Sequence, residues 1–178
     1  MPQMWQANSW GLELILVYAG FGKGKTCACV GQALRAAGNG LRVLFGQFLK
    51  RENLAGEQKM LAAFSSIQYK ACGLGFIRSQ EGMPAHRAKA KELLAWVAMQ
   101  EMDMLILDEA LNAMEHKLIN QEDLSPYLTA AGNYNFHLVL SGRIAPDWLI
   151  PMADTFTEML PYKHQFEKGV SAIKGLEF

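Results

Sequence analysis

The sequence predicts an α/β protein with a mostly parallel sheet and helices on both faces. Two observations carry this prediction. Apolar segments of strand length alternate along the chain with segments of helical periodicity. A loop rich in glycine and lysine, Ala19–Thr26, follows the first apolar segment and precedes the first helical one. Together they indicate a three-layer P-loop NTPase (RecA-like) fold with five or six strands and right-handed crossovers.

The first unit is a strand, a helix and a second strand. Leu12–Tyr18 is apolar except for Glu13, which predicts a strand buried on both faces. Thr26–Ala37 has small and apolar residues at helical spacing, and the following Gly38-Asn39-Gly40 is typical of a helix C-terminus. Val43–Phe48 returns to strand character and completes a βαβ unit.

The later segments continue the alternation. Pro84 suits the first turn of a helix, whereas Pro126 lies inside a helical segment and predicts a break there. The order of the strands does not follow from these patterns. The expected elements are strands at Ile67–Ala71, Met102–Ala110, Phe136–Gly142 and Asp154–Leu160, and helices at Pro84–Gln100 and Gln121–Ala131.

Composition predicts a single domain over residues 1–178, because this length supports one substantial core. Seventeen basic and seventeen acidic side chains cancel, which argues against nucleic acid or an anionic membrane as a partner. No apolar run has the length of a membrane span. Cys27, Cys29 and Cys72 form neither a metal-spaced set nor a disulfide framework, so we expect a cytoplasmic protein.

The loop Ala19–Thr26 fits a relaxed Walker A pattern, with Ala19 where the first glycine usually stands. Its glycines permit the dihedral angles that bring backbone N–H groups to phosphate oxygens, and the helix N-terminus adds positive potential. Lys25 is expected on the phosphates and Thr26 on Mg²⁺. For Lys23 a solvated surface charge is an equal alternative. The candidate nucleotide-binding residues are Gly20, Phe21, Gly22, Lys23, Gly24, Lys25, Thr26 and Cys27.

Two carboxylates follow a second apolar strand. Met104–Leu107 precedes Asp108 and Glu109, as in a Walker B motif, where a buried strand delivers acidic residues beside the phosphate loop. One of these acids is expected to orient the metal ion. Arg143 follows another strand at the same edge of the sheet and is a candidate phosphate contact.

A phosphate loop leaves the reaction open. ATP hydrolysis, phosphoryl transfer to a small molecule and a guanine-nucleotide switch all use it. The sequence has no NKxD motif for reading guanine, and its six arginines are scattered rather than gathered in a kinase lid. Both absences weaken the switch and kinase interpretations.

Six motifs carry a resemblance that runs in order from about Glu13 to the end of the chain. They resemble those of P-loop ATP:corrinoid adenosyltransferases, also called cob(I)yrinic acid a,c-diamide or cob(I)alamin adenosyltransferases. The final motif is the most specific, because generic NTPases do not share it. The motifs are GFGKGKT at Gly20–Thr26, QFLK at Gln47–Lys50, LDEALNAM at Leu107–Met114, SGR at Ser141–Arg143, ADTFTEM at Ala153–Met159 and KHQFEKGVSAIKGLEF at Lys163–Phe178.

The resemblance implies transfer of the 5′-deoxyadenosyl group of ATP to a cobalt(I) corrinoid, with release of triphosphate. The cofactor's metal is then the nucleophile, so the protein needs no nucleophilic side chain. Lys25 and Mg²⁺ (or Mn²⁺) would neutralise the leaving group. Thr26 and Glu109 are the implied metal ligands, with Asp108 as the alternative that supports the site from behind. The catalytic candidates are accordingly Lys25 and Glu109.

The resemblance also implies a corrinoid-covering loop at Cys72–Arg78, in which Phe76 helps to exclude the lower axial ligand of cobalt. Some family members have tryptophan where this chain has Arg78, which leaves that role open, and simple core packing is the alternative for Phe76. A homodimer and a flavoprotein reductant are further implied partners. The other functional hypotheses are a generic ATPase or kinase that makes ADP, and a non-catalytic nucleotide-sensing module.

Overall fold

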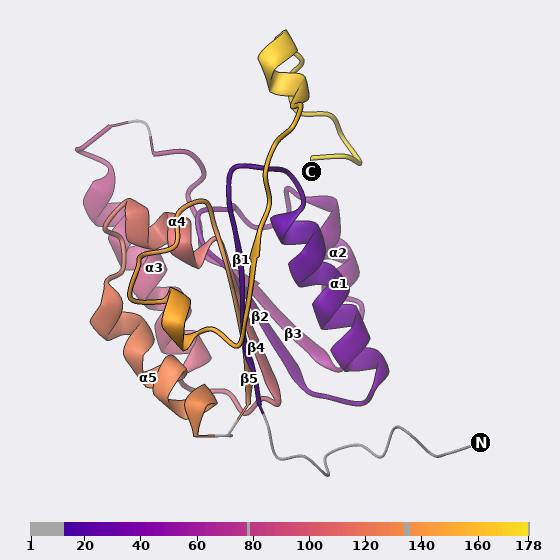
Figure 1. The fold of residues 1–178 in the computed structure, drawn as a ribbon, viewed down its shortest axis with the longest axis vertical. Coiled ribbons are helices and arrows are strands. Elements are labelled where there is room, and N and C mark those ends of the chain that lie inside the picture. Colours follow the sequence, from indigo (N-terminus) through magenta and orange to yellow (C-terminus); the bar gives the residue numbers. More distant parts are fainter. Residues whose placement is uncertain (1–12, 78, 134–135, 178) are drawn as a thin grey trace.

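The computed structural model describes residues 13–77, 79–133 and 136–177. Its centre is a parallel sheet of six strands in the order β3-β2-β4-β5-β1-β6 (Figure 1). The strands are β1 Ile15–Ala19, β2 Val43–Gln47, β3 Ile67–Ala71, β4 Met104–Asp108, β5 His137–Ser141 and β6 Thr155–Glu158; the helices are α1 Lys25–Gly38, α2 Gly56–Leu61, α3 Met83–Val97, α4 Ala110–Glu115 and α5 Gln121–Gly132.

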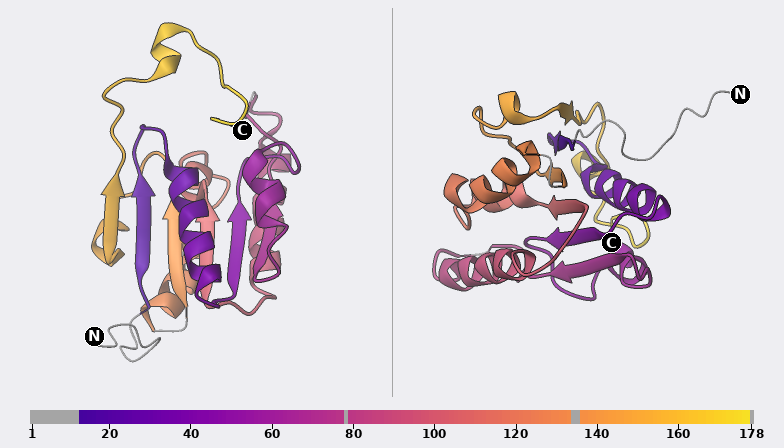
Figure 2. Two further views of the ribbon diagram at one scale, coloured as in Figure 1. Left: turned by 90° about the vertical axis from the view of Figure 1, so that its right-hand side faces the viewer. Right: turned by 90° about the horizontal axis from the view of Figure 1, so that it is seen from below.

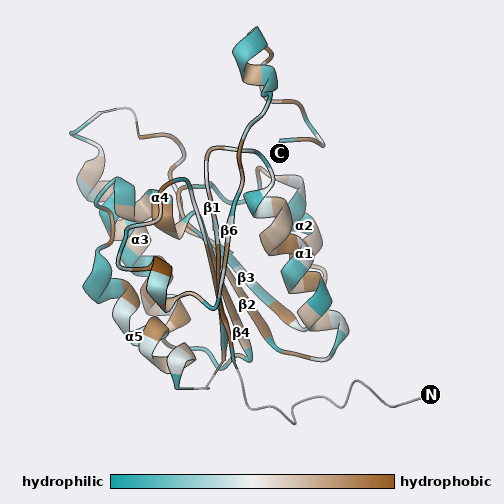
Figure 3. Cartoon of the chain, viewed as in Figure 1, coloured by the Kyte–Doolittle hydropathy of each residue, from teal (hydrophilic) through white to brown (hydrophobic). Residues whose placement is uncertain are grey.

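Helices cover both faces of the sheet, which confirms the predicted three-layer α/β class. α1 and α2 lie on one face, and α3, α4 and α5 lie on the other (Figures 1 and 2). Successive residues of a strand point to opposite faces, so Ile106 packs in the cluster under α1 while Leu105 and Leu107 pack in the cluster under α3 to α5. The central strands are therefore apolar along most of their length, and polar residues such as Gln47 and Asp108 stand at their carboxyl ends (Figure 3).

The predicted elements are present, with ends shifted by up to three residues among the residues described; Leu12 lies outside them. The expected break at Pro126 is wrong, because α5 continues through it. Pro126 is exposed, so water solvates the carbonyl group that its missing N–H leaves without a partner. The short helices α2 and α4, six residues each, were not predicted.

The carboxyl ends of the strands gather the candidate site at one edge of the sheet. Gln47 at the end of β2 pairs with Asp108 at the end of β4, and Ala19 pairs with Glu158 of β6. After β6 the chain rises above this edge, passes through the short 3₁₀ helix Gln165–Lys168 and returns toward α1 (Figure 2). Within the part of the chain that the structure describes, no helix has the length and apolarity to cross a membrane.

Candidate nucleotide-binding site

The loop between β1 and α1 is fixed by its own backbone. Gly20 and Gly24 have positive φ angles of 105° and 120°, a region that glycine enters without strain. Gly20 N–H donates to the Arg143 carbonyl oxygen (2.8 Å), and Gly22 N–H donates to that of Met159 (2.7 Å). These two N–H groups are thus occupied within the protein, and phosphate binding by the loop stays a prediction. Both glycines anchor the loop to the chain after β5 and β6.

The close approach of Met159 explains why glycine is needed at two of these positions. A Cβ atom on Gly20 would lie 2.5 Å from the Met159 carbonyl oxygen, and one on Gly22 would lie 2.7 Å from it. Neither distance is compatible with a side chain, so the loop's shape depends on both glycines. The segment directly after β6 therefore supports the loop.

A cavity of about 710 Å³ lies in front of the loop. It brings together most of the sequence-predicted residues, while Gly20, Asp108 and Phe76 do not line it. It also adds residues that the sequence did not single out for this role. The predicted lining residues are Phe21, Gly22, Lys23, Gly24, Lys25, Thr26, Cys27, Glu109 and Arg143, and the added ones include Lys50, Glu57, Asn112, His164 and Gly175 to Glu177.

Lys25 reaches back over the loop. Its Nζ donates to the carbonyl oxygens of Gly20 and Gly22, each at 2.6 Å. Burial and the Arg143 guanidinium lower the pKa of Lys25, and the carboxylates of Asp108 and Glu109 partly oppose this. The Lys25 ammonium thus donates to neutral oxygens of the loop. The oxygens of an anionic ligand can replace them and form stronger hydrogen bonds with it.

The two acidic residues after β4 occupy different positions. Asp108 is fully buried and accepts hydrogen bonds from Thr26 Oγ1 (3.0 Å), Ser141 Oγ (2.6 Å) and Gln47 Nε2 (2.9 Å). Glu109 takes the left-handed conformation (φ 61°), and its N–H donates to Ser141 Oγ (2.9 Å). This turn directs Glu109 to the cavity while Asp108 holds the Thr26 hydroxyl from behind.

Glu109 binds its proton more tightly than an ordinary glutamate. Burial first, and then the neighbouring Asp108 carboxylate, raise the pKa of Glu109 from 4.5 to about 7, although Lys50, Arg143 and Lys25 oppose the shift. A charged Glu109 is therefore costly in the ligand-free protein. A bound cation would lower that cost and displace the proton.

This shift predicts a pH dependence of stability for the ligand-free protein. Between pH 4.5 and about 7 the unfolded chain releases the Glu109 proton while the folded chain keeps it. The contribution of Glu109 to the free energy of unfolding is thus full below pH 4.5 and is lost as the pH rises through about 7. The Glu109→Gln variant has no such proton to release. As the pH rises from about 4.5 to 8, we expect its free energy of unfolding to increase by about 2 to 3 kcal/mol relative to that of the unsubstituted chain. Urea unfolding of both proteins checks this, and parallel pH profiles would contradict it.

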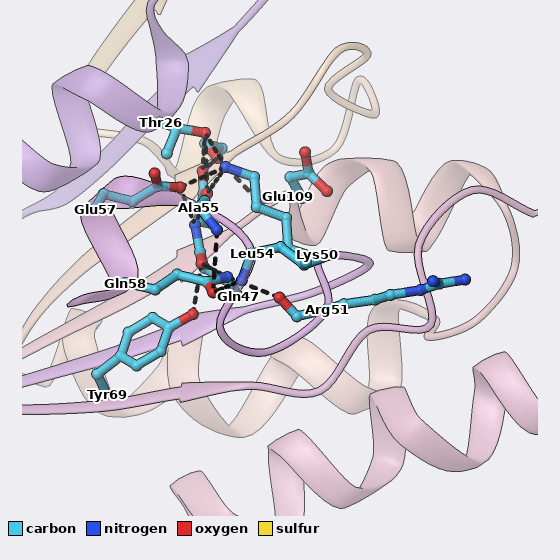
Figure 4. Close-up of polar contacts among 12 residues, drawn as sticks. Thr26, Gln47, Lys50, Arg51, Leu54, Ala55, Glu57, Gln58, Tyr69 and Glu109 are labelled. Carbon is cyan, nitrogen blue, oxygen red and sulfur yellow. Dashed lines mark hydrogen bonds and ion pairs between the residues drawn. The ribbon is translucent and has the colours of Figure 1, made fainter. Parts of the chain in front are cut away.

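A buried polar cluster that the sequence did not predict lies beside the acidic residues (Figure 4). Gln47 is fully buried and donates to Asp108, and its own oxygen accepts from Gln58 Nε2 (3.1 Å) and Tyr69 OH (2.7 Å). Lys50 pairs with Glu57 at 2.9 Å. A glutamine at the end of the apolar strand β2 was the available signal, because a buried amide requires polar partners.

The remaining candidates fall into two groups. Lys23 lines the cavity and pairs with Glu177 (2.8 Å), and its phosphate contact stays a prediction; Cys27 is exposed at the cavity wall. Phe76 is 89% exposed, so the core-packing alternative for it is wrong. Its corrinoid contact stays a prediction, and Arg78 lies outside the described residues.

Solved structures with a similar fold have little sequence identity to this chain. The flagellar accessory protein FlaH from Methanocaldococcus jannaschii superimposes with a TM-score of 0.56 and 14% identity, covering 82% of this chain and 70% of that one. The KaiC-like protein PH0186 from Pyrococcus horikoshii gives a TM-score of 0.52 at 14% identity, covering 86% and 74%. These similarities concern the fold alone, and they agree with the predicted three-layer P-loop architecture.

Sequence comparisons are more specific. A corrinoid adenosyltransferase of Pseudomonas aeruginosa is 34% identical over 172 residues, which span 93% of this chain and 83% of that protein. The corrinoid adenosyltransferase CobA of Salmonella typhimurium is 29% identical over 171 residues, spanning 93% and 85%. The model of the family ATP:corrinoid adenosyltransferase BtuR/CobO/CobP matches residues 12–178. This chain therefore belongs to the ATP:corrinoid adenosyltransferase family.

Proposed function

We propose that this protein transfers the 5′-deoxyadenosyl group of ATP to the cobalt(I) of a corrinoid and releases triphosphate. The observation that carries the proposal is the family match over residues 12–178, together with a cavity that joins the phosphate loop to Glu109. The reaction requires a place for the whole triphosphate, and the cavity presents Lys23, Lys25 and Arg143 to it. Generic ATP hydrolysis or phosphoryl transfer has no comparable support.

A divalent cation fits the residues present. The Thr26 hydroxyl and the Glu109 carboxylate both line the cavity, and hard oxygen donors of this kind suit Mg²⁺ or Mn²⁺. Asp108 accepts the Thr26 hydrogen, which leaves the lone pairs of that oxygen for the metal. We assign Thr26 and Glu109 as ligands and Asp108 as the residue that orients Thr26. When bound, the cation supplies positive charge to the leaving triphosphate.

The side chains of this protein act by positioning and charge. The electron pair of cobalt(I) forms the bond to C5′, and the pair of the C5′–O bond leaves with the triphosphate. Because no proton moves in this step, no general base is needed. Lys25 exchanges the loop carbonyls for phosphate oxygens and stabilises the charge that develops there. Arg143 at the cavity wall adds to the same field.

Four further assignments concern the corrinoid contact, two partners and the location of the enzyme. Phe76, exposed on the loop after β3, is our choice for the contact with the lower face of the corrinoid. We also propose a homodimer, a flavoprotein as the source of electrons, and a cytoplasmic location. The free cysteines among the described residues support the last of these, because they fit a reducing compartment.

Product analysis tests the proposed function. The protein is incubated anaerobically with Mg-ATP and chemically reduced cobalamin, and the products are followed by absorbance and by anion chromatography. We expect a light-sensitive alkyl-cobalt spectrum and one intact triphosphate for each corrinoid converted. ADP and phosphate without a spectral change would replace this function with an ATPase or kinase, and binding without turnover would indicate a nucleotide-sensing module.

A further inference from the structure

Lys50 places a further ammonium group at the nucleotide site, on a different element from the phosphate loop that carries Lys23 and Lys25. Its Nζ lies 2.9 Å from Glu57 Oε1, 3.4 Å from Thr26 Oγ1 and 3.9 Å from Asp108 Oδ2 (Figure 4). The Glu57 and Asp108 carboxylates face this ammonium from α2 and from the end of β4. Lys50 therefore stays charged beside the cavity that it lines.

Glu57 is the partner that holds this charge. It also lines the cavity, and the Lys50 ammonium outweighs the effect of burial and lowers the pKa of Glu57. Gln47 Nε2 donates both to Glu57 (3.3 Å) and to Asp108 (2.9 Å), so one buried amide fixes the two carboxylates that face Lys50. Among the described residues the Lys50 ammonium donates to Glu57 Oε1 (2.9 Å) and to Thr26 Oγ1 (3.4 Å), which leaves one of its three N–H groups for a further acceptor.

Hydrogen bonds hold the backbone at Lys50 in place, and the side chain lines the cavity. Leu49 adopts a positive φ of 60°, and Lys50 N–H donates to the Phe48 carbonyl oxygen (2.6 Å). Gly73 N–H donates to the Lys50 carbonyl oxygen (2.8 Å), and a Cβ on Gly73 would lie 1.9 Å from the Leu49 carbonyl carbon. The tight turn fixes where the Lys50 stem begins, and the flexible stem lets Nζ reach from Glu57 into the cavity.

We propose that Lys50 is a further triphosphate-binding residue and that Glu57 is its positioning residue, which competes with the triphosphate for the ammonium. In the ligand-free protein Nζ rests on Glu57. A triphosphate carries several negative charges, so its oxygens attract Lys50 as well as Lys23, Lys25 and Arg143 and draw Nζ away from Glu57. Release of the product returns Nζ to Glu57. This assignment rests on the proposed function, in which the triphosphate departs whole.

Binding of inorganic triphosphate, measured by calorimetry in the absence of corrinoid, tests the assignment. Lys50→Met keeps the aliphatic stem and removes the charge, and we expect it to weaken binding about tenfold, as for loss of one charge-assisted contact. Lys50→Gln, with a polar end, should behave alike. Lys59→Ala on α2 is the matched control, because Lys59 is exposed and does not line the cavity; its affinity should equal that of the unsubstituted chain.

Glu57→Gln separates competition from a structural role. Without the competing carboxylate we expect triphosphate to bind several-fold tighter, and this gain should disappear in the Lys50→Met background. A gain that persists there would be a general effect of removing negative charge and would overturn the role of Glu57. Unchanged affinity in both Lys50 variants, with melting temperatures like that of the unsubstituted chain, would overturn the role of Lys50.

The proposed function can fail independently of this inference. A protein that forms the alkyl-cobalt product but binds triphosphate equally well with and without Lys50 would refute the inference alone. A protein that forms no such product, yet loses triphosphate affinity on Lys50→Met, would refute the proposed function alone.

Discussion

Replacing Lys25 with alanine is expected to lower the rate of adenosylation by about a hundred- to a thousandfold, as for loss of a preorganised charge at a leaving group. Lys25 Nζ already lies inside the loop, bound to two carbonyl oxygens at 2.6 Å, so the charge is in place before the nucleotide arrives. Burial lowers the pKa of Lys25 because neutral oxygens solvate the ammonium less well than water does. The charged oxygens of a leaving triphosphate solvate the ammonium better than the neutral carbonyl oxygens do.

The rate of alkyl-cobalt formation under saturating ATP and corrinoid is the measurement. Lys59→Ala on α2 controls for the loss of a lysine and should retain the full rate. Because Lys25 also ties the loop together, the melting temperature of Lys25→Ala is needed as well. A folded Lys25→Ala protein with a near-normal rate would remove the proposed role of the residue.

Replacing Glu109 with alanine is expected to lower the rate about a hundredfold and to raise the Mg²⁺ concentration needed for half-maximal rate. The left-handed backbone at Glu109 turns its side chain to the cavity, whereas Asp108 is fully buried and already accepts three hydrogen bonds. Of the two carboxylates, Glu109 is therefore the one that we expect to bind the cation. Because the pKa of Glu109 is raised to about 7, protons compete with the metal ion for its carboxylate. We therefore also expect metal binding by the unsubstituted enzyme to weaken below about pH 7.

Glu115→Ala is the matched control for Glu109→Ala. Glu115 is exposed and is the last residue of α4, the helix that Glu109 directly precedes. The Glu115→Ala variant should leave both the rate and the Mg²⁺ requirement unchanged. If Glu109→Ala keeps the normal Mg²⁺ requirement while Asp108→Asn loses metal dependence in a folded protein, the ligand assignment passes from Glu109 to Asp108.

The sequence predicts the parts of the site that depend on local pattern. Glycines, lysine and threonine follow one another in the loop before α1, and the two acidic residues directly follow an apolar strand, so each signal lies within eight residues or fewer. The parallel sheet then places both at one edge without further information. For the same reason the class of fold and most of the elements are predictable.

The other contacts of the site join residues that are far apart in the sequence. Gln47 and Asp108 meet across 61 residues, and Lys23 and Glu177 meet only because the chain after β6 folds back over the loop. Glu57 lies on a helix of six residues, too short for periodicity to reveal. The register of β2 against β4, which no local pattern determines, brings Gln47 beside Asp108.

The position of β1 in the sheet has a consequence for folding. Its partners are β5 and β6, with Ile15 opposite Leu138 and Leu16 opposite Thr155, so every ladder that holds this strand closes a loop of more than a hundred residues. Such long closures are entropically costly and form slowly compared with the nearer pairing of β2 with β3. We therefore expect the strand that carries the phosphate loop, although early in the chain, to be among the last to be fixed, so that the capacity to bind nucleotide marks the completed fold.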